Sequence, residues 1–181
     1  KKAPVRITLV DRRNHHLFQP LLYQVATAVL NPADISVPIR WLLRKQQNVT
    51  VVMAEVDAID PAAHTIAIDG GTVQLHFDYL VLAAGARHAY FGHPEWEQFA
   101  PGLKSLEDAQ RIRRELLLAF ERAETEPDPI VRQRLMSICV IGGGPTGVEL
   151  AGACAELTRH VLRRDFHHID PGATRVRLIE G

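Results

Sequence analysis

Short runs of apolar and β-branched residues mark the first half of the chain, and such runs predict strands. The first run, residues 5–10, ends on Asp11. A helix is predicted after Ser36, which stands where an N-terminal cap would stand. Residues 49–76 contain several short runs separated by turn residues, which predicts a strand followed by a small antiparallel meander. One further strand, which we expect to be buried, is predicted over residues 79–83.

The second half of the chain begins with its clearest helical pattern. Residues 103–124 place apolar side chains on one stripe, and Ser105 opens a sequence typical of a capping box. A compact apolar run at 137–141 predicts a strand, and residues 148–158 have the length and composition of a helix. The last run, 176–179, predicts a strand again. This order of strand, helix and strand is the one that a dinucleotide-binding unit requires.

Three glycines link the run at 137–141 to the following helix in the pattern G-x-G-x-x-G. Gly142 permits a tight turn, Gly144 lets the backbone approach a pyrophosphate, and Gly147 lets the helix pack closely on the strand. The phosphates would face free N–H groups at the positive end of the helix. A glycine-rich loop can carry this pattern by chance, but the strand before it and the helix after it are the context that nucleotide binding requires.

Glu180 follows the last predicted strand and stands where a dinucleotide-binding unit places an acid on the ribose. It lies further beyond the glycines than the roughly 20 residues that are usual. Residues 163–174 account for the extra length, and their Asp, Pro and Gly predict a loop that lengthens the path without moving the strand end. A carboxylate at this position would repel the extra phosphate of NADPH, so the sequence favours NADH.

Asp11 ends the first predicted strand as Glu180 ends the last, which predicts two dinucleotide-binding units in series. The fold class is therefore α/β, with two Rossmann-like units that are both incomplete. We expect the first strand and glycine loop of the first unit to lie upstream of Lys1, and the second unit to stop before its remaining strands. A boundary before the long helix gives domains of residues 1–104 and 105–181. Taken alone, Asp11 is also explained as an ordinary turn residue.

The chain has 181 residues, of which 46% are hydrophobic, and it carries 21 basic and 21 acidic residues. This composition is typical of a globular protein with a substantial core and unlike that of a disordered chain. The zero net charge and the scattered arginines give no electrostatic reason to expect nucleic acid as a partner. No apolar stretch approaches the roughly 20 residues of a membrane span. The two cysteines, Cys139 and Cys154, form no metal or disulfide spacing, so both are expected in the core.

The sequence resembles the flavoprotein oxidoreductases in which an FAD domain carries an inserted NAD(P)H domain. Within them it resembles type II NADH dehydrogenase, a single-subunit NADH:quinone oxidoreductase. Residues 1–104 would then be the FAD-binding domain with its β-meander, and residues 105–181 the first half of the NADH-binding domain. The resemblance spans nearly the whole chain and is carried by five motifs, DRRNHHLFQPLLYQVAT, PIR, FDYLVLAAGARHAYFG, FAPGLKSLEDA and VIGGGPTGVELAG.

The resemblance implies FAD and NADH as cofactors. Asp11 would bind the adenosine ribose of FAD, Val56 would meet the adenine through its backbone, and the segment at Gln24 would lie near the isoalloxazine. Val56 has a simpler explanation as an ordinary strand residue. The FAD-binding set that the resemblance implies is Asp11, Arg12, Gln24, Val25, Ala26, Val56, Ala84 and Gly85.

The same resemblance implies that the glycine loop holds the NADH pyrophosphate, with Glu180 on the ribose. Glu149 is implied as the catalytic residue, because it would face the nicotinamide and the flavin. Its alternative role is that of a first-turn acid stabilised by the helix dipole. The NADH-binding set that the resemblance implies is Gly142, Gly144, Pro145, Thr146, Gly147 and Glu180.

The chain has no cysteine before Cys139, which disfavours the thiol relay of flavin disulfide reductases. The resemblance implies instead that hydride passes from NADH to FAD and that electrons pass on to a quinone, at the inner face of the plasma membrane. It also implies peripheral membrane association through segments outside this chain, and a homodimer. Adjacent histidines such as His15 and His16 point in different directions on a strand or a helix, so no metal site is expected.

Two alternatives stay open. Another member of the same superfamily, linked to sulfide or to ferredoxin, would share motifs that are generic to it. The chain as given is alternatively a non-catalytic nucleotide-binding fragment, because without a first glycine loop the FAD pyrophosphate loses its helix N-terminus.

Overall fold

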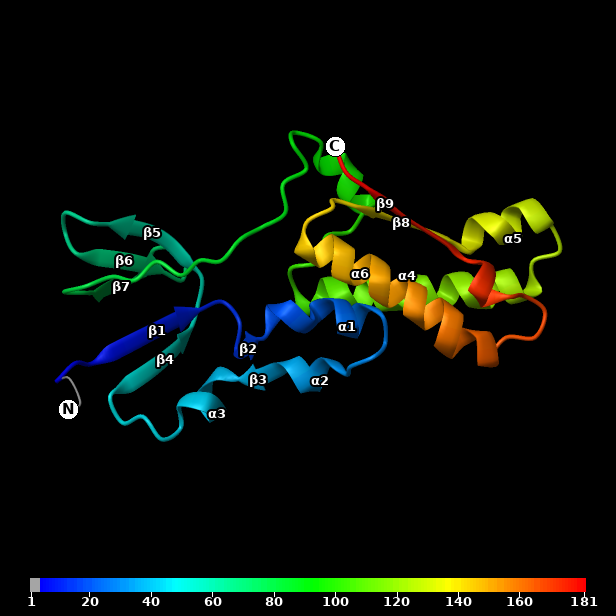
Figure 1. Cartoon of the computed structure of the whole chain (residues 1–181). Helices are drawn as coiled ribbons and strands as arrows, with labels where there is room; N and C mark the ends of the chain where they lie inside the picture. The colour runs from blue at the N-terminus through cyan, green and yellow to red at the C-terminus, as the bar shows by residue number, and fades with distance from the viewer. Residues whose placement is uncertain (1–3) are drawn as a thin grey trace. The chain divides into compact units, whose positions relative to one another are not determined.

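The computed structural model describes residues 4–181, which divide into two compact units. Unit 1 comprises residues 4–17 and 36–85, and unit 2 comprises residues 18–35 and 86–181 (Figure 1). The units therefore alternate along the sequence. These compact units are not the predicted cofactor-binding domains, residues 1–104 and 105–181. The division into those domains stays a prediction.

Within the described residues, unit 1 holds three small sheets and one short helix. The strands β1 and β4 pair in parallel, with Asp11 opposite Met53, and β2 pairs with β3 in the antiparallel sense. The elements of unit 1 are β1 (Ile7–Asp11), β2 (His15–Leu17), β3 (Ser36–Pro38), α3 (Ile39–Leu43), β4 (Val49–Met53), β5 (Val56–Asp60), β6 (Thr65–Ile68) and β7 (Val73–His76).

The antiparallel meander predicted for this region is confirmed by β5, β6 and β7. The central strand, β6, buries Thr65, Ile66 and Ile68. The turn from β6 to β7 runs through residues 69–71, all at positive φ, a conformation that Asp and Gly adopt more readily than most residues. Local turn chemistry and β-branched runs are therefore sufficient to form this sheet.

The helix predicted after Ser36 begins later than expected. Ser36 lies in β3, where it pairs with Leu17, and so the prediction that it caps a helix is wrong. The helix α3 begins at Ile39, directly after Pro38. Pairing with β2 holds Ser36 in an extended conformation, and the proline then marks the point where the chain turns into the helix.

The buried strand predicted over residues 79–83 is not formed. These residues lie outside the strands of the described structure, and Tyr79 and Val81 are 94% and 84% exposed. An apolar run becomes a buried strand only where neighbouring strands satisfy its N–H and C=O groups. Among the described residues, no strand pairs with this run.

In unit 2, the helix α4 (Leu106–Thr125) confirms the predicted capping box. The N–H of Asp108 donates to Ser105 Oγ at 3.1 Å, and the N–H of Ser105 donates to the Asp108 carboxylate at 2.8 Å. From the apolar stripe of α4, Phe120 is fully buried and packs with Leu157 and Leu162. The stripe therefore contributes to the core of this unit.

The parallel strands β8 and β9 and the helix between them confirm the predicted strand–helix–strand order. Ser137 lies opposite Arg175, and Ile141 lies opposite Ile179. The helix α1 packs against both α4 and α6 in this unit (Figure 1). The remaining elements of unit 2 are η1 (Gln19–Leu21), α1 (Leu22–Ala26), α2 (Pro32–Ile35), η2 (Pro94–Gln98), α5 (Pro129–Leu135), β8 (Ser137–Ile141), α6 (Pro145–Glu156), the π-helical turn η3 (Leu157–Val161), η4 (Leu162–Arg164), η5 (Pro171–Ala173) and β9 (Arg175–Ile179).

The two cysteines have different surroundings. Cys154 in α6 is buried, as predicted, and burial raises the pKa of its thiol to about 11. Cys139 in β8 is exposed, so the prediction of a core position is wrong. Side chains along a strand alternate between two faces, and in β8 the neighbouring Val140 takes the buried one.

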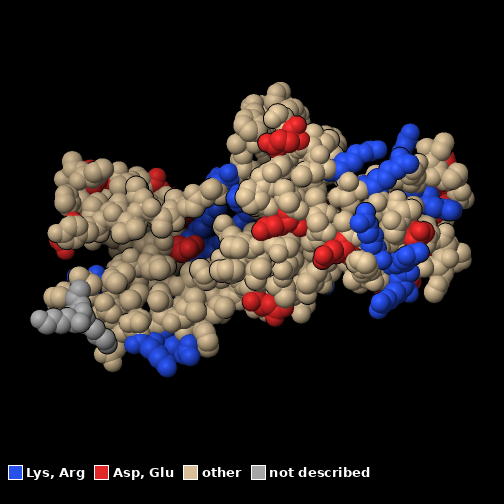
Figure 2. All heavy atoms as spheres, in the orientation of Figure 1, with Lys and Arg blue, Asp and Glu red and all other residues tan. Residues whose placement is uncertain are grey.

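The charged side chains are mixed over the surface, in keeping with the zero net charge. Basic side chains gather over α5 in unit 2 and over α3 in unit 1 (Figure 2). Of the helices in the described part of the chain, none is long and apolar enough to cross a membrane.

Candidate nucleotide-binding site

Unit 2 turns from strand to helix through the glycine loop at residues 142–144. Gly142 has a φ of +102°, which favours glycine, and its N–H donates to the Ile179 carbonyl at 2.8 Å. The helix α6 begins at Pro145, with Gly144 as its N-cap and no side-chain cap. A Cβ placed on Gly144 would meet nothing within 4 Å. The backbone at the positive end of this helix is therefore open to an anion.

Gly147 packs the first turn of α6 against the loop. A Cβ at this position would lie 1.9 Å from the carbonyl oxygen of Gly142 and 3.6 Å from Leu178 Cδ1. The first distance is far shorter than a van der Waals contact, and the atom in the way belongs to the backbone. The helix can approach the loop this closely only because residue 147 is glycine.

Glu180 follows β9 and lies at the same edge of the sheet as the glycine loop. Its carboxylate accepts a hydrogen bond from the backbone N–H of Gly143. Because Ile141 and Ile179 lie opposite each other in parallel strands, the residues after both strands emerge together. The longer connection before β9 therefore leaves the strand end in place, as predicted. Nothing in the local sequence signals the bond itself, which joins residues 37 positions apart.

The connection between α6 and β9 is held against α4. Phe166 and Ile169 pack against the buried Phe120 cluster. The Glu124 carboxylate accepts hydrogen bonds from the backbone N–H of His167 at 3.0 Å and from His168 Nδ1 at 2.8 Å. Burial raises the pKa of the Glu124 carboxyl, but the hydrogen bonds from the two histidines outweigh it and lower the pKa to about 2.

Glu149 is exposed on the second turn of α6. The first turn of this helix contains no acid, so the alternative explanation of Glu149 as a first-turn acid is wrong. The helix dipole stabilises a negatively charged side chain mainly within the first turn, and this stabilisation falls off beyond that turn. The role that the family resemblance implies for Glu149 stays a prediction.

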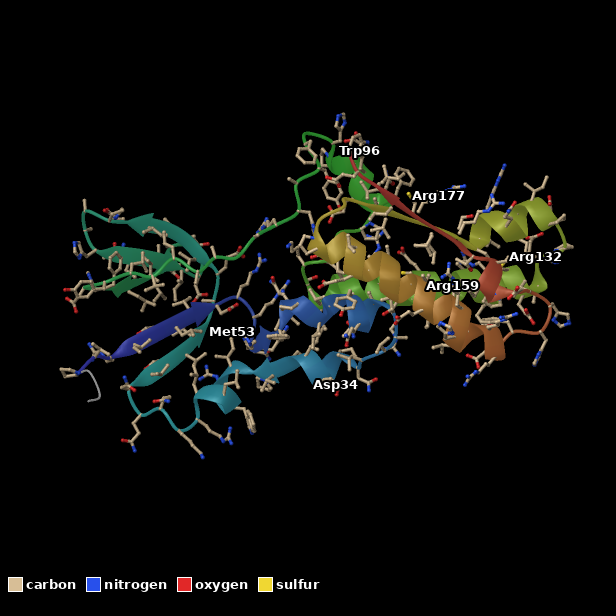
Figure 3. The ribbon with its side chains drawn as sticks, viewed as in Figure 1. Asp34, Met53, Trp96, Arg132, Arg159 and Arg177 are labelled. Carbon is tan, nitrogen blue, oxygen red and sulfur yellow. The ribbon has the colours of Figure 1, made fainter. Side chains whose placement is uncertain are left out.

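In unit 1, Asp11 ends β1 beside the end of β4. Its Oδ1 accepts a hydrogen bond from the N–H of Arg13 at 2.8 Å, and its carbonyl accepts one from the N–H of Ala54 at 3.1 Å. Met53, its partner in the strand register, is labelled in Figure 3. Val56 opens β5, in the separate three-stranded sheet, only two residues after Ala54, so the chain brings Val56 close to the end of β1. The half-buried carboxylate is suited to the hydroxyls of a ribose.

The other predicted flavin residues of unit 1 are Arg12, Ala84 and Gly85, and all three are exposed. Gly85 has a φ of +73° and lies with Ala84 in a stretch without regular structure. Exposure alone does not tie these residues to a flavin. Their role stays a prediction.

In unit 2, Gln24, Val25 and Ala26 belong to α1. Val25 and Ala26 are fully buried, and Gln24 is half-buried with its Nε2 donating to the hydroxyl of Tyr23 at 3.0 Å. Burial of two of the three side chains is explained by packing of α1 on α4 and α6. Of the three, Gln24 therefore has the side chain best placed to reach a ligand.

A turn with a strained residue ends α1. The N–H of Val29 donates to the Gln24 carbonyl at 2.8 Å, and the N–H of Ala28 donates to the Val25 carbonyl at 3.2 Å. These two bonds define a Schellman motif, in which the residue after the cap takes the left-handed conformation and is usually glycine. Here that residue is Ala28, with a φ of +62°.

The chain has two pairs of adjacent histidines, His15–His16 and His167–His168, and one histidine of each pair has a side-chain contact. His168 contacts Glu124, whereas His15 lies in β2 opposite Pro38, with its Nδ1 3.3 Å from Asn14 Oδ1. Within residues 4–181, no group of three or more His, Cys, Asp or Glu side chains is arranged to hold a metal ion.

Comparison with known sequences identifies a family. The family model described as pyridine nucleotide-disulphide oxidoreductase matches residues 1–178. Two Mycobacterium tuberculosis proteins, type II NADH:quinone oxidoreductases Ndh and NdhA, are 47% and 46% identical over 99% of this chain. The external alternative NADH-ubiquinone oxidoreductase of Yarrowia lipolytica mitochondria is 36% identical over 87% of it. The chain spans 39% of each M. tuberculosis protein and 29% of the Yarrowia protein.

Solved structures share the fold. NDH2 from Plasmodium falciparum, solved in complex with NADH, matches 97% of this chain and 37% of its own, with a TM-score of 0.85 and 27% identity. The sulfide:quinone oxidoreductase of Aquifex aeolicus matches 97% of this chain and 37% of its own, with a TM-score of 0.71 and 24% identity, which shows the fold alone. The α/β class with Rossmann-like units is confirmed by these matches.

Proposed function

Because the chain belongs to the pyridine nucleotide-disulphide oxidoreductase family, we propose that the protein containing it transfers a hydride from NADH to FAD and passes the electrons to a quinone. The observation that carries this proposal is the glycine loop of unit 2. An uncapped helix N-terminus, an open backbone at Gly144 and the Glu180 carboxylate meet there at one sheet edge. The M. tuberculosis relatives support the quinone, since both are described as NADH:quinone oxidoreductases.

The glycine loop would hold the pyrophosphate of NADH. Thr146 and Gly147 would offer backbone N–H groups from the first turn of α6, and Gly144 would leave room for the phosphates. Pro145 has no N–H to leave unsatisfied and presets the helical φ at the first position. Glu180 would accept hydrogen bonds from the ribose hydroxyls and repel a 2′-phosphate, which favours NADH over NADPH.

FAD, when bound, supplies the acceptor for the hydride. The Asp11 carboxylate, at the end of β1 beside β4, would accept hydrogen bonds from the adenosine ribose. The backbone of Val56 would meet the adenine, and Gln24 would lie near the isoalloxazine. The full set proposed for FAD is Asp11, Arg12, Gln24, Val25, Ala26, Val56, Ala84 and Gly85.

Glu149 would act at the nicotinamide, because its exposed carboxylate stands one helical turn beyond the pyrophosphate loop. Its negative charge would help to orient the nicotinamide toward the flavin. The chain has no cysteine before Cys139, so no thiol pair of this segment takes the electrons. A separate acceptor is therefore needed, and quinone is the one proposed.

The same proposal assigns residues 1–104 to an FAD-binding domain and residues 105–181 to an NADH-binding domain. It includes a peripheral position at the inner face of the plasma membrane, where a lipid-soluble quinone is accessible, and a homodimer.

The test uses the intact protein with its bound cofactors. Under anaerobic conditions its visible spectrum should show flavin bands that bleach when NADH is added, and NADH oxidation should require a quinone. Glu149→Gln should lower kcat at least about tenfold. Glu156→Gln, at the other end of α6, should leave kcat unchanged.

Two outcomes would contradict the proposal. The first is a folded preparation without flavin. The second is activity with sulfide or ferredoxin but not with NADH, which would favour another member of the superfamily.

A further inference from the structure

The chain passes from unit 1 into unit 2 for the last time between Gly85 and Ala86. The next residues, 86–104, have no regular structure apart from η2. Contacts of their side chains therefore hold them to the rest of unit 2. The hydroxyl of Tyr90 donates to the Ala100 carbonyl at 2.8 Å, and His88 lies beside the first turn of α4.

The His88 ring lies against Gly102 and beside Asp108. A Cβ at Gly102 would overlap the ring, so the ring can take this place only because residue 102 is glycine. The ring Nε2 lies 3.6 Å from the Asp108 carboxylate, which is too far for a hydrogen bond. This nitrogen is nevertheless buried, and among the described residues it has no hydrogen-bond partner. A buried polar atom without a partner is costly, and here the nearest acceptor is a carboxylate.

Asp108 stays an anion over the pH range in which histidines titrate. Burial raises the pKa of its carboxyl, but hydrogen bonds from Ser105 and Lys104 outweigh burial and lower the pKa. Its Oδ2 accepts from the backbone N–H of Lys104 at 3.1 Å and from that of Ser105 at 2.8 Å. The negative charge is therefore fixed at the start of α4. Histidine gains its positive charge between about pH 8 and pH 5.

The other ionisable groups at this place are of types that titrate outside this range. The Tyr90 ring centre lies 6.3 Å from that of His88, and burial raises the pKa of the tyrosine. Glu97 and Arg111 lie near Tyr90, and Arg111 donates to the Glu115 carboxylate at 2.8 Å. Tyrosine, glutamate and arginine side chains do not ordinarily change charge between pH 5.5 and pH 8. A change of charge there is therefore that of His88.

We propose that His88 and Asp108 form a pH-sensitive contact, which holds the start of segment 86–104 against α4 when His88 is protonated and releases it when His88 is neutral. Protonation makes both ring nitrogens donors, so Nε2 would gain a charge opposite to that of its neighbour. The pH would then set how freely the chain moves where it enters unit 2. This inference goes beyond the proposed function and does not depend on it.

The test measures cleavage of the intact protein by trypsin after Arg87, the exposed residue directly before His88. A protease cleaves a segment that is free to extend into its active site, so a contact at the next residue should slow cleavage. At low trypsin concentration the rate follows the population of the open form. The peptides are quantified by mass spectrometry after digestion at pH 5.5 and at pH 8.

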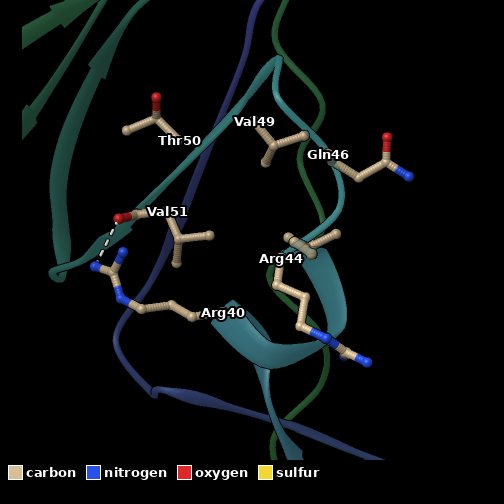
Figure 4. A pocket seen from close by; sticks show the side chains of 7 residues that line it. Arg40, Arg44, Gln46, Val49, Thr50 and Val51 are labelled. Carbon is tan, nitrogen blue, oxygen red and sulfur yellow. Dashed lines mark hydrogen bonds between the residues drawn. The ribbon is translucent and has the colours of Figure 1, made fainter.

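Unit 1 supplies an internal reference for the pH dependence of trypsin itself. Arg44 and Lys45 are exposed directly after α3. Arg40 Nη2 donates to the Val51 carbonyl at 2.8 Å and so holds α3 to β4 (Figure 4). A guanidinium keeps its charge over this range, so this contact does not change with pH. Each rate of cleavage after Arg87 is therefore divided by the rate after Arg44 and Lys45.

The relative rate of cleavage after Arg87 should be about two- to fivefold higher at pH 8 than at pH 5.5, as expected for a partly exposed ion pair. This change with pH should vanish in His88→Gln. It should also vanish in Asp108→Asn, which leaves the residue after the cleaved bond unaltered.

Two further variants separate the contact from a general effect of pH. Gly102→Ala should abolish the change although both titrating groups remain, because its Cβ displaces the His88 ring. His93→Gln removes the other histidine of the segment, whose Nδ1 lies 3.0 Å from Glu95 Oε1. This variant should keep the change, because its contact lies within the segment and not with α4.

Three results would overturn the inference. The first is a relative rate that is the same at both pH values in the parent. The second is a change that persists in Asp108→Asn, which would mean that His88 affects trypsin directly. The third is an equal loss of the change in His93→Gln.

Discussion

The backbone N–H of Gly143 donates a hydrogen bond to the carboxylate of Glu180, 37 residues further along the chain. This bond ties the glycine loop after β8 to the end of β9, so the two parts of the proposed NADH site hold each other in place. A carboxylate has two oxygens that accept several hydrogen bonds. Glu180 can therefore keep the loop and still accept from a ribose.

Glu180→Ala should raise the KM for NADH about tenfold or more, with a smaller change in kcat. The variant loses a hydrogen bond to a charged group at the loop, worth about 1.5–3 kcal/mol, and the proposed bond to the ribose. Steady-state kinetics with NADH and with NADPH measure the effect, and the preference for NADH should also fall. Glu156→Ala, an exposed glutamate at the end of α6, is the control. An unchanged KM for NADH would remove Glu180 from the site.

Substitutions at Gly147 and Gly144 should have different effects, the first mainly on folding stability and the second mainly on NADH binding. At Gly147 a Cβ would meet the carbonyl oxygen of Gly142 at 1.9 Å, whereas at Gly144 nothing lies within 4 Å. Gly147→Ala should therefore cost about 1–3 kcal/mol of folding free energy. Gly144→Ala should cost less than about 1 kcal/mol but should raise the KM for NADH, because the methyl group fills the space of the pyrophosphate.

Urea unfolding and NADH kinetics on the two variants measure this separation. The expected pattern is a lower midpoint for Gly147→Ala and a near-normal midpoint with weaker NADH binding for Gly144→Ala. Equal midpoints for the two variants would contradict the geometry of the loop.

Ala28→Gly should stabilise the protein by about 0.5–1 kcal/mol. A left-handed conformation costs a residue with a Cβ about 1–2 kcal/mol, and glycine removes this cost while adding about 0.5–1 kcal/mol of chain entropy on unfolding. Ala28 has a φ of +62° at the end of α1. The urea midpoint should rise for this variant, whereas Ala119→Gly, inside α4, should lower it. A lower midpoint for both would mean that the turn carries no strain.

The parts of the fold that follow from local chemistry could be predicted from the sequence. The capping box of Ser105 and Asp108 sets the start of α4, and the glycine pattern sets the turn into α6. The meander follows from turn residues between short β-branched runs. In each case the residues that decide the structure lie within a few positions of one another.

Burial could not be predicted in the same way, because it depends on neighbours that are distant in sequence. Residues 79–83 and Cys139 are apolar, yet they are exposed. An apolar run indicates that burial would be favourable, but whether it is buried depends on the elements that pack on it. The same limit applies to the site, where the glycines could be predicted and the bond from Gly143 to Glu180 could not.

The contact of Glu124 with His167 and His168 could not be predicted from the sequence either, because these histidines lie 43 and 44 residues beyond Glu124. It predicts a pH dependence of stability. The pKa of Glu124 is lowered to about 2 in the folded protein, from an ordinary value of 4.5. A carboxyl whose pKa is lower in the folded state stabilises that state above its unfolded pKa. The contribution is therefore fully present above about pH 4.5 and is lost as the pH falls toward 2.

Glu124→Gln tests this dependence, because glutamine has nearly the same shape and does not titrate. The free energy of unfolding of both proteins should be measured by urea from pH 2 to pH 7. The parent should be the more stable at pH 7, and the difference should shrink between about pH 4.5 and pH 2, where the carboxyl becomes protonated. Glu121→Gln, on the exposed surface of α4, should show no such trend. A difference between the parent and Glu124→Gln that stays constant over this range would mean that the two histidines do not stabilise the charged carboxylate.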